Sequence, residues 1–367
     1  MNRRLRELLT LAGIARGRAA PPAWSGVILL KNWGGVPAVR RPAATYLAER
    51  GFNLLLLGPR GVPTHFCKCR PDSNIPLRRE VAVLTTLCRD PELSGIVPET
   101  WGVRGARVQL LISAYLPGTP LDRTVARLSP AQWADTTSEI LTLVHRIGQR
   151  AAATLPEVTG AGAVLGLQPA ARGALARLAT LGLGRGSLIP LEEALRTAGT
   201  VPAFPQHGDL WPSNVVRSGG SWRLLDFEEF ATVAVPLYDA WHLVRTCSDL
   251  RRGGGDKGTP RLWMDRLLAG DVEAEACWRP LGLAARRHAL SAPQVVGTLG
   301  YYLIHATTQF HARGGPRSYW ESHALELQRL SDILGSRRGS ERFVTALQAA
   351  GAGSGSGDRG AAARAPD

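Results

Sequence analysis

The segment from His207 to Asn214 places polar side chains at a spacing that can do chemistry. It reads His-Gly-Asp-Leu-Trp-Pro-Ser-Asn, and an Asp-Phe-Glu triplet begins at Asp226, twelve residues after Asn214. Two leucines precede Asp226, which indicates a strand that leads into a loop, where catalytic groups tend to lie. Asp209 can accept a hydroxyl proton, and Asn214 and Asp226 offer the oxygen ligands that Mg²⁺ prefers. Phosphoryl transfer needs mainly positioning and charge neutralisation, and these groups supply both.

The pattern His-x-Asp-x-x-x-x-Asn followed by Asp-Phe-Glu resembles the catalytic loop and metal-binding Asp of the aminoglycoside phosphotransferase and choline kinase-like families. These are small-molecule kinases with a protein-kinase-like fold, and the resemblance covers about residues 52–335. It implies that Asp209 orients or deprotonates the substrate hydroxyl and that His207 braces the catalytic loop. It also implies that Asn214 and Asp226 bind Mg²⁺.

Such a fold requires a Lys on an early strand and a Glu on the following helix. Lys68 and Glu80 meet this requirement, so the resemblance implies that Lys68 contacts the ATP phosphates and that Glu80 holds Lys68 in place. The chain has only three lysines, and Lys31 is the rival position. Apart from Glu49, no suitably placed Glu follows Lys31 before the strand that carries Lys68, so we prefer Lys68 as the phosphate-binding lysine.

Two further nucleotide contacts are expected from the same resemblance. The stretch before Gly118 resembles a hinge, and the adenine ring is expected to bond the Ser113 carbonyl and the Tyr115 amide. A simple strand end is the alternative. The chain departs from the glycine-rich phosphate loop of protein kinases. The turn around Arg60 stands between the first two predicted N-lobe strands, where backbone amides and Arg60 can contact phosphate, and a plain β-turn is the alternative.

Hydrophobic patterning divides the chain into four segments, and the resemblance to the kinase-like families implies what the two middle segments do. Residues 1–51 are an N-terminal extension of uncertain structure that includes an apolar strand, Gly26–Leu30. Residues 52–118 predict a nucleotide-binding N-lobe and hinge. Residues 119–335 predict a helical C-lobe with the catalytic loop and substrate site, and residues 336–367 predict a largely disordered tail. The expected fold class is α+β: a bilobal protein-kinase-like fold with a small β-rich N-lobe and a larger, mostly helical C-lobe.

Individual elements follow from the same patterns. The expected N-lobe elements are strands at 53–57, 64–70 and 108–113 and a helix at 76–88. The expected C-lobe helices are 130–147, 169–181, 190–197, 237–250, 261–268, 284–290, 293–312 and 318–334. At several of these positions a proline is expected to begin the helix.

Composition excludes several other classes of protein. The net charge is +14, with 44 Lys+Arg against 30 Asp+Glu, but no nucleic-acid-binding motif accompanies the arginines, so a solvated surface is expected. No apolar run approaches the roughly 20 residues of a membrane-spanning helix. Five irregularly spaced cysteines argue against a disulfide framework, and a cytoplasmic location is the default expectation.

The predicted function is an ATP- and Mg²⁺-dependent transfer of the γ-phosphate to a hydroxyl of a small molecule. The basic charge favours a neutral or anionic acceptor, such as a sugar, a glycoconjugate precursor or a nucleoside-like metabolite, over an aminoglycoside antibiotic. A catalytically silent kinase-like module that binds a nucleotide or a partner stays open as the alternative.

Overall fold

The chain divides into two units, which are described separately. The first comprises residues 1–119 and 214–230, and the second comprises residues 120–213 and 231–367. The computed structural model describes residues 26–30, 52–71, 74–104, 108–160, 162–181, 183–252, 262–312 and 317–352. Across these stretches, no helix combines the length and the apolar character needed to cross a membrane.

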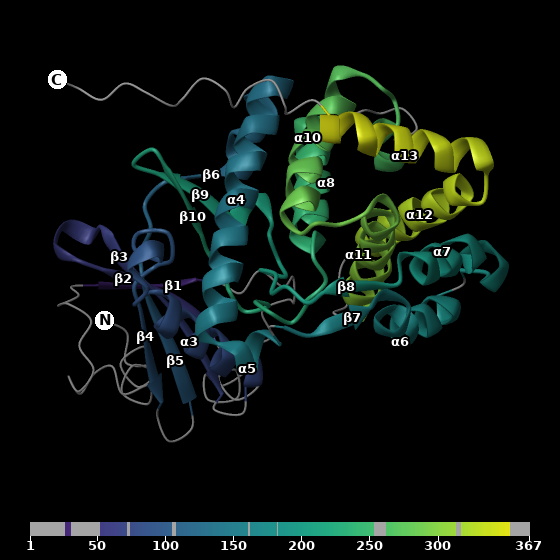
Figure 1. Ribbon diagram of the computed structural model, residues 1–367. Coiled ribbons are helices and arrows are strands. Elements are labelled where there is room, and N and C mark those ends of the chain that lie inside the picture. Colours follow the sequence, from purple (N-terminus) through teal and green to yellow (C-terminus); the bar gives the residue numbers. More distant parts are fainter. Residues whose placement is uncertain are drawn as a thin grey trace, which may run out of the picture. The chain divides into compact units, whose positions relative to one another are not determined.

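A five-stranded antiparallel sheet dominates the first unit (Figure 1). Its strands are β1 (Gly26–Leu30), β2 (Phe52–Leu57), β3 (Pro63–Pro71), β4 (Thr100–Arg104) and β5 (Val108–Ala114), in the spatial order β1-β2-β3-β5-β4. β1 pairs with β2 along its full length. The predicted N-terminal extension therefore contributes a strand to this sheet, and the sheet begins before the expected boundary at residue 52.

The alternation of side chains along β3 separates packing residues from polar ones. Cys67 and Cys69 are fully buried, free thiols that point to one face of the sheet, and Lys68 points to the other. Lys68 stands opposite Asn53 of β2 and Leu111 of β5. The register thus places a lysine in the middle of the sheet, flanked by a strand on each side.

Helix α3 (Ile75–Leu87) covers the sheet because glycine allows a close approach. The helix begins at Asn74, whose side chain accepts a hydrogen bond from the Leu77 amide at 2.8 Å. A Cβ atom on Gly102 of β4 would lie 2.2 Å from Cγ1 of Val81. The absence of a side chain at Gly102 therefore sets how near α3, and with it Glu80, lies to the strands.

A hairpin of β9 (Val215–Ser218) and β10 (Ser221–Leu224) completes the first unit, and β6 (Thr119–Pro120) pairs beside β9. The Leu225 amide donates to the carbonyl of Asn214 at 2.9 Å. The hairpin therefore brings its two ends together, so that Asn214 and the residues after Leu225 are neighbours.

The second unit is mostly helical and packs around buried aromatic residues such as Trp133, Trp241, Trp263 and Tyr302. Its helices are α4 (Pro130–Thr154), α5 (Pro156–Thr159), α6 (Leu167–Thr180), α7 (Arg185–Ala198), α8 (Tyr238–Arg251), α9 (Trp263–Leu267), α10 (Val272–Arg287), α11 (Ala292–Ala312), α12 (Arg317–Leu334) and α13 (Arg337–Ala352). A small pair of strands, β7 (Val164–Gly166) and β8 (Thr200–Pro202), accompanies them. The expected α+β class, with a β-rich part and a larger helical part, is confirmed.

Several helices differ from the sequence-based expectation; α4 continues to Thr154, beyond the expected end at 147, and three larger differences follow. α7 begins at Arg185 and continues through Pro190, and α10 begins at Val272 and continues through Pro280. A proline inside a helix removes one hydrogen bond but does not always end the helix. The third difference is α13, which occupies part of the predicted disordered tail. Phe343 of α13 is fully buried against Trp278, and this apolar contact anchors the helix.

Candidate functional site

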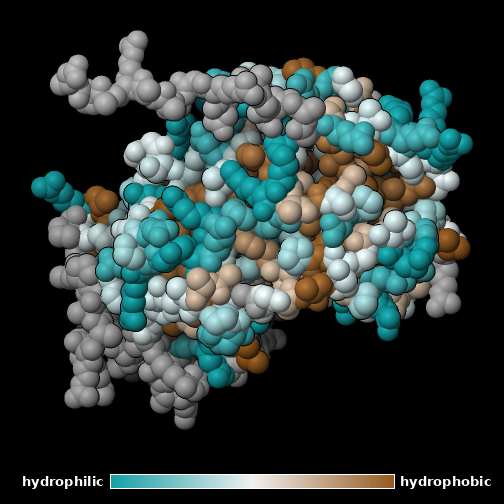
Figure 2. All heavy atoms as spheres, in the orientation of Figure 1, coloured by the Kyte–Doolittle hydropathy of each residue, from teal (hydrophilic) through white to brown (hydrophobic). Residues whose placement is uncertain are grey.

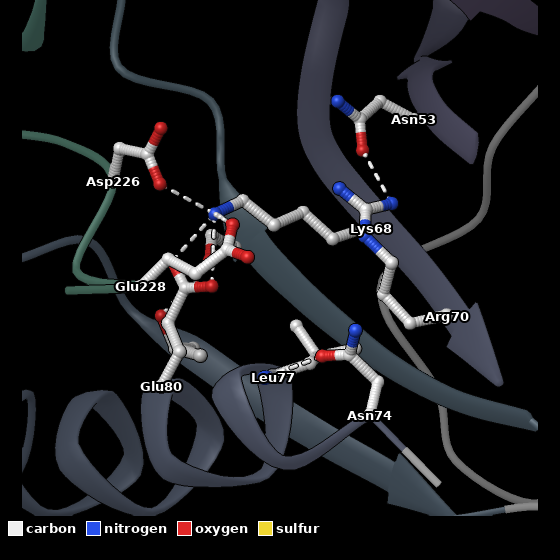
Figure 3. Close-up of polar contacts among 10 residues, drawn as sticks. Asn53, Lys68, Arg70, Asn74, Leu77, Glu80, Asp226 and Glu228 are labelled. Atoms are coloured by element: carbon white, nitrogen blue, oxygen red, sulfur yellow. Dashed lines mark hydrogen bonds and ion pairs between the residues drawn. The ribbon is translucent and has the colours of Figure 1, made fainter. Parts of the chain in front are cut away.

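Lys68 lies at the centre of a cluster of carboxylates in the first unit (Figure 3). Its Nζ donates to both carboxylate oxygens of Glu80 at 2.8 Å and to Oδ1 of Asp226 at 2.6 Å. Glu228 Oε2 lies 3.7 Å from the same nitrogen. The strand β3, the helix α3 and the segment after β10 each contribute one or more of these groups. The structure therefore brings together three of the residues that the sequence singled out: Lys68, Glu80 and Asp226.

Burial and the neighbouring charges shift the pKa values of Lys68 and Glu80 in opposite directions. Burial by itself lowers the pKa of Lys68, but the carboxylates of Glu80 and Asp226 outweigh it and raise that pKa above the ordinary value. Burial raises the pKa of Glu80 to about 7, and the ammonium of Lys68 opposes this rise. We take Lys68 as charged at neutral pH, because three carboxylates surround one ammonium.

The backbone at Asp226 is unusual for a residue with a side chain. Its φ angle of +62° lies in the left-handed region. Non-glycine residues held in that region are concentrated at functional sites. The side chain of Asp226 is 41% exposed, whereas that of Glu80 is 1% exposed. Asp226 is thus the more accessible of the two carboxylates that bind Lys68.

A cluster of oxygen ligands accompanies the ion pairs. One carboxylate oxygen from each of Glu80, Asp226 and Glu228 lies within 4.8 Å of the other two. The sequence analysis assigns no role to Glu228. Its place two residues after Asp226, in the same Asp-Phe-Glu triplet, is the feature that could have indicated one. Asn214, the other predicted metal ligand, lines the same cavity as these three carboxylates.

The cavity around Lys68 has a volume of about 290 Å³ and is lined entirely by residues of the first unit. Its polar end holds Lys68, Asn214 and the three carboxylates, together with Asn53 and Arg70. Arg70 donates to Oδ1 of Asn53 at 3.0 Å (Figure 3). The lining also includes Leu111, which stands opposite Lys68 in the sheet, and the end of β5 with the residues that follow: Ser113, Ala114, Tyr115 and Leu116.

The backbone at the end of β5 alters the expected adenine contacts. The Tyr115 amide donates to the Thr64 carbonyl at 2.8 Å, so this amide continues the β3–β5 ladder and is not available to a ligand. The Ser113 side chain exchanges a hydrogen bond with Thr100 at 3.1 Å. The sequence-based choice of the Tyr115 amide is therefore corrected, because alternate residues of a strand direct their amides to opposite sides.

Arg60 lies outside the cavity. The turn that contains it joins β2 to β3, and Arg60 is exposed with a φ angle of +72°. β1 precedes β2, so the loop between the first two strands of the sheet falls within residues 31–51, outside the described residues. The sequence placed Arg60 between the first two strands because β1 was not assigned to this sheet.

The loop that carries His207, Gly208 and Asp209 is held in the second unit by Asp239. The carboxylate of Asp239 accepts hydrogen bonds from the His207 amide at 2.5 Å and the Gly208 amide at 2.9 Å. Gly208 has a φ angle of +82°, which favours glycine. Burial raises the pKa of Asp239 to about 7, and the two amide donors oppose this rise. Asp239 thus fixes the backbone immediately before Asp209.

Aromatic and imidazole rings follow Asp209 in the second unit. Trp211 meets the ring of His242 edge to face, with centroids 4.9 Å apart. Further contacts of 5.3 to 6.0 Å between centroids join His242 to Tyr302, Tyr302 to Tyr238, Tyr238 to His305 and His305 to Tyr301. Trp211, Tyr301 and His305 are partly exposed. These six rings therefore form one continuous set that begins two residues after Asp209.

The chain is similar to one family of known proteins and to several solved structures. The family model described as the phosphotransferase enzyme family matches residues 66–281. No curated protein sequence matches the chain. Among solved structures, a glucosamine kinase in complex with glucosamine, ADP and inorganic phosphate is 15% identical, with a TM-score of 0.49, and the match covers 80% of this chain and 81% of that one.

Two further solved structures are similar at comparable levels. The apo form of a thermostable mutant of aminoglycoside phosphotransferase APH(4)-Ia is 14% identical, with a TM-score of 0.46, over 91% of this chain and 96% of that one. A Plasmodium vivax ethanolamine kinase is 12% identical, with a TM-score of 0.43, over 76% of this chain and 79% of that one.

Proposed function

Because the chain belongs to the phosphotransferase enzyme family, we propose that it transfers the γ-phosphate of ATP to a hydroxyl group of a small molecule. The observation that carries this proposal is the position of Lys68, whose ammonium joins Glu80 and Asp226 inside a cavity of about 290 Å³. A fixed cation beside oxygen ligands is what phosphoryl transfer requires of a protein.

In this proposal Lys68 binds the α- and β-phosphates, and Glu80 holds it in place. Glu80 is 1% exposed and gives both of its oxygens to Lys68, so its own contact with a ligand is unnecessary for this role. Asp226 also bonds Lys68 here, and a bound nucleotide exchanges that contact for phosphate oxygens.

The residues around Lys68 fit a magnesium ion. Mg²⁺ prefers carboxylate, carbonyl and water oxygens, and Asp226, Asn214 and Glu228 supply such groups within one cavity. We assign Asp226 and Asn214 as its ligands, as the sequence suggests, and add Glu228. When bound, the ion would neutralise charge on the phosphate oxygens.

The adenine ring is expected at the β5 end of the cavity. Since the Tyr115 amide bonds Thr64, we propose that the ring instead bonds the carbonyl of Ala114 and the amide of Leu116. Both residues line the cavity. Replacing Leu116 with proline would remove that amide and weaken nucleotide binding, whereas Leu116→Ala would retain it.

Asp209 is the proposed group that orients or deprotonates the acceptor hydroxyl. Its backbone is fixed through the bonds of Asp239 to His207 and Gly208, which supports a positioning role for His207 as well. The rings next to Asp209 suit a neutral acceptor with an apolar face, such as a sugar or a nucleoside, because aromatic surfaces bind such faces without a charge. Polycationic acceptors would require more carboxylates.

The test is a titration with ATP and Mg²⁺, followed by assays of acceptor-dependent ADP release with sugars, nucleosides, sugar acids and aminoglycosides. The wild-type protein is expected to bind the nucleotide in a Mg²⁺-dependent manner, and Asp226→Ala is expected to lose that dependence. Asp209→Asn is expected to bind ATP normally but to transfer phosphate about a hundredfold or more slowly.

Two results would contradict an active kinase. Folded protein that binds no nucleotide would favour a silent module that binds a partner. Protein that binds Mg²⁺ and ATP but transfers phosphate to none of these acceptors would favour a silent nucleotide-binding module.

A further inference from the structure

Two neighbouring cavities in the second unit share three lining residues, Leu268, Arg338 and Arg342. The larger, of about 830 Å³, lies among α4, α10, α13 and the turn before α10. The smaller, of about 470 Å³, lies among α9, α12 and the start of α13. Small-molecule sites have volumes of about 300 to 1,000 Å³. Neither cavity contains a residue to which we assign a part in phosphate transfer.

Most of the exposed surface in the larger cavity is apolar, although Asp271, Glu275, Glu341, Arg279 and Arg286 also line it. Its apolar lining consists of Leu267, Leu268, Ala269, Ala274, Trp278, Leu283, Ala346 and Ala349. The indole nitrogen of Trp278 donates to the Leu267 carbonyl at 2.8 Å, so the polar group of this side chain is already satisfied. Figure 2 shows hydrophobic residues gathered in the upper right of the view, in the region where Figure 1 draws α12 and α13. An alkyl or aryl group fits this lining.

The smaller cavity is lined mostly by charged and polar side chains. Arg329 pairs with Asp265 at 2.7 Å, and Asp332 accepts a hydrogen bond from Gln328 at 3.0 Å. Arg342 donates to the Leu268 carbonyl at 2.8 Å. In the part of the chain that the structure describes, no carboxylate pairs with Arg338 or Arg342. The two guanidinium groups that both cavities share are exposed, and the positive charge of neither is neutralised by a paired carboxylate within the described residues, so both can receive an anion.

The start of α13 adds to the positive potential at this junction. The N-terminal end of a helix carries partial positive charge, and acidic side chains are favoured there. α13 instead begins with Arg337 and Arg338 and has no acidic residue in its first turn. Glu341, one turn further on, pairs with Arg337 at 3.0 Å. Among the residues that the structure describes, no carboxylate pairs with Arg338 in the same way, and a bound anion would neutralise its charge.

We propose that the paired cavities bind one anionic amphiphile. The apolar body lies in the larger cavity against Trp278, and a carboxylate or phosphate monoester head lies at the junction on Arg338 and Arg342. The apolar lining selects the body, and the guanidinium pair selects the sign of the head. This site is separate from the proposed transfer reaction and does not depend on it.

The first experiment measures binding of dodecanoate and dodecyl phosphate to the full-length protein by calorimetry, below their micellar concentrations. Dodecanol and dodecyltrimethylammonium are the comparison ligands. Both anions are expected to bind at least about tenfold more tightly than dodecanol, the value of one charge-assisted hydrogen bond, and the cation is expected not to bind. Bromine-labelled dodecanoate is expected to quench tryptophan fluorescence less in Trp278→Phe than in the wild type.

Variants separate the two halves of the site. Arg338→Gln combined with Arg342→Gln is expected to remove the preference for anions, whereas the neighbouring Arg337→Gln is expected to retain it, since Arg337 pairs with Glu341. Ala346→Trp fills the apolar half and is expected to abolish binding in protein whose circular dichroism is unchanged. Nucleotide binding is measured in each variant and is expected to stay the same.

Three results would overturn the proposal. The first is equal binding of dodecanol and the anions. The second is anion binding that survives both the double arginine variant and Ala346→Trp. The third is binding to vesicles of anionic phospholipid with none to the monomeric amphiphiles, which would indicate adsorption of a basic surface to a membrane.

Discussion

The ammonium of Lys68 and the carboxylate of Glu80 form a buried, two-oxygen ion pair, with the nitrogen 2.8 Å from each oxygen. Lys68 is 5% exposed and Glu80 1% exposed. Taking both charges out of water costs free energy that their attraction repays only when the geometry is good. We therefore propose that the pair positions the ammonium of Lys68, which also donates to Asp226.

Removing Lys68 should expose how strongly this cluster depends on its cation. Lys68→Met leaves Glu80, Asp226 and Glu228 with oxygens within 4.8 Å of one another and no ammonium among them. We expect the free energy of unfolding to fall by about 3–5 kcal/mol, as for other broken buried pairs, in urea titrations at pH 7. The double variant Lys68→Met, Glu80→Leu should recover a substantial part of the loss. Equal stability of wild type and Lys68→Met would show that the charges are not coupled.

The close approach at Gly102 gives a second prediction. Gly102→Ala would place a methyl group 2.2 Å from Cγ1 of Val81 and push α3 away from β4. We expect a loss of about 1–3 kcal/mol in the free energy of unfolding and weaker ATP binding, because α3 carries Glu80. Adding Val81→Ala removes the clash and should restore much of both properties. A double variant no better than Gly102→Ala would place the cause elsewhere.

The sequence predicted the parts of the site that depend on local pattern. Lys68 lies on a strand and Glu80 on the next helix, and both positions follow from the period of apolar residues around them. The motif that ends in Asp226 has a fixed order along the chain, so its residues could be named in advance. Their convergence on one nitrogen is a tertiary contact, and the resemblance to known kinases, not periodicity, indicated it.

The features that were missed depend on contacts distant in the sequence. β1 was recognised as a strand, but its pairing with β2 spans residues 31–51, and a local pattern carries no information about such a partner. The placing of Arg60 followed from that omission. The Tyr115 amide was misjudged because its acceptor, the Thr64 carbonyl, is 51 positions away along the chain. The sequence does not predict α13, because few apolar residues stand among its Gly, Ala and Arg, and Phe343 is buried through tertiary contacts that include Trp278.

A third prediction concerns Glu228, whose carboxylate joins the cluster of oxygen ligands. Glu228→Gln should weaken the Mg²⁺ dependence of nucleotide binding, because a neutral amide is a poorer ligand for a hard cation than a carboxylate. The measurement is the apparent Mg²⁺ affinity at fixed ATP. Glu229→Gln is the matched control, because Glu229 is next to Glu228 in the sequence but its carboxylate is not part of the cluster. If both variants lower the Mg²⁺ affinity equally, the loss would reflect the removal of negative charge in general, and Glu228 would not be a ligand of the ion.

The buried carboxylate of Asp239 gives a prediction for the pH dependence of stability. Its pKa in the folded protein is raised to about 7 by burial, whereas an unfolded Asp titrates near about 3.9. Between these values the folded state holds a proton that the unfolded state has released. The contribution of Asp239 to the free energy of unfolding is therefore fully present below about pH 4, falls as the pH rises to about 7, and is constant above that.

Asp239→Asn tests this sign, because an amide does not titrate in this range. The unfolding free energy of the wild type minus that of the variant should fall between about pH 4 and pH 7 and then level off, as measured by urea titrations at several pH values. The variant should also be less stable throughout, because one amide oxygen cannot accept from both the His207 and Gly208 amides without placing its NH₂ group against a donor. A difference that does not change with pH would mean that Asp239 is ionised throughout the range and that the amide donors outweigh its burial.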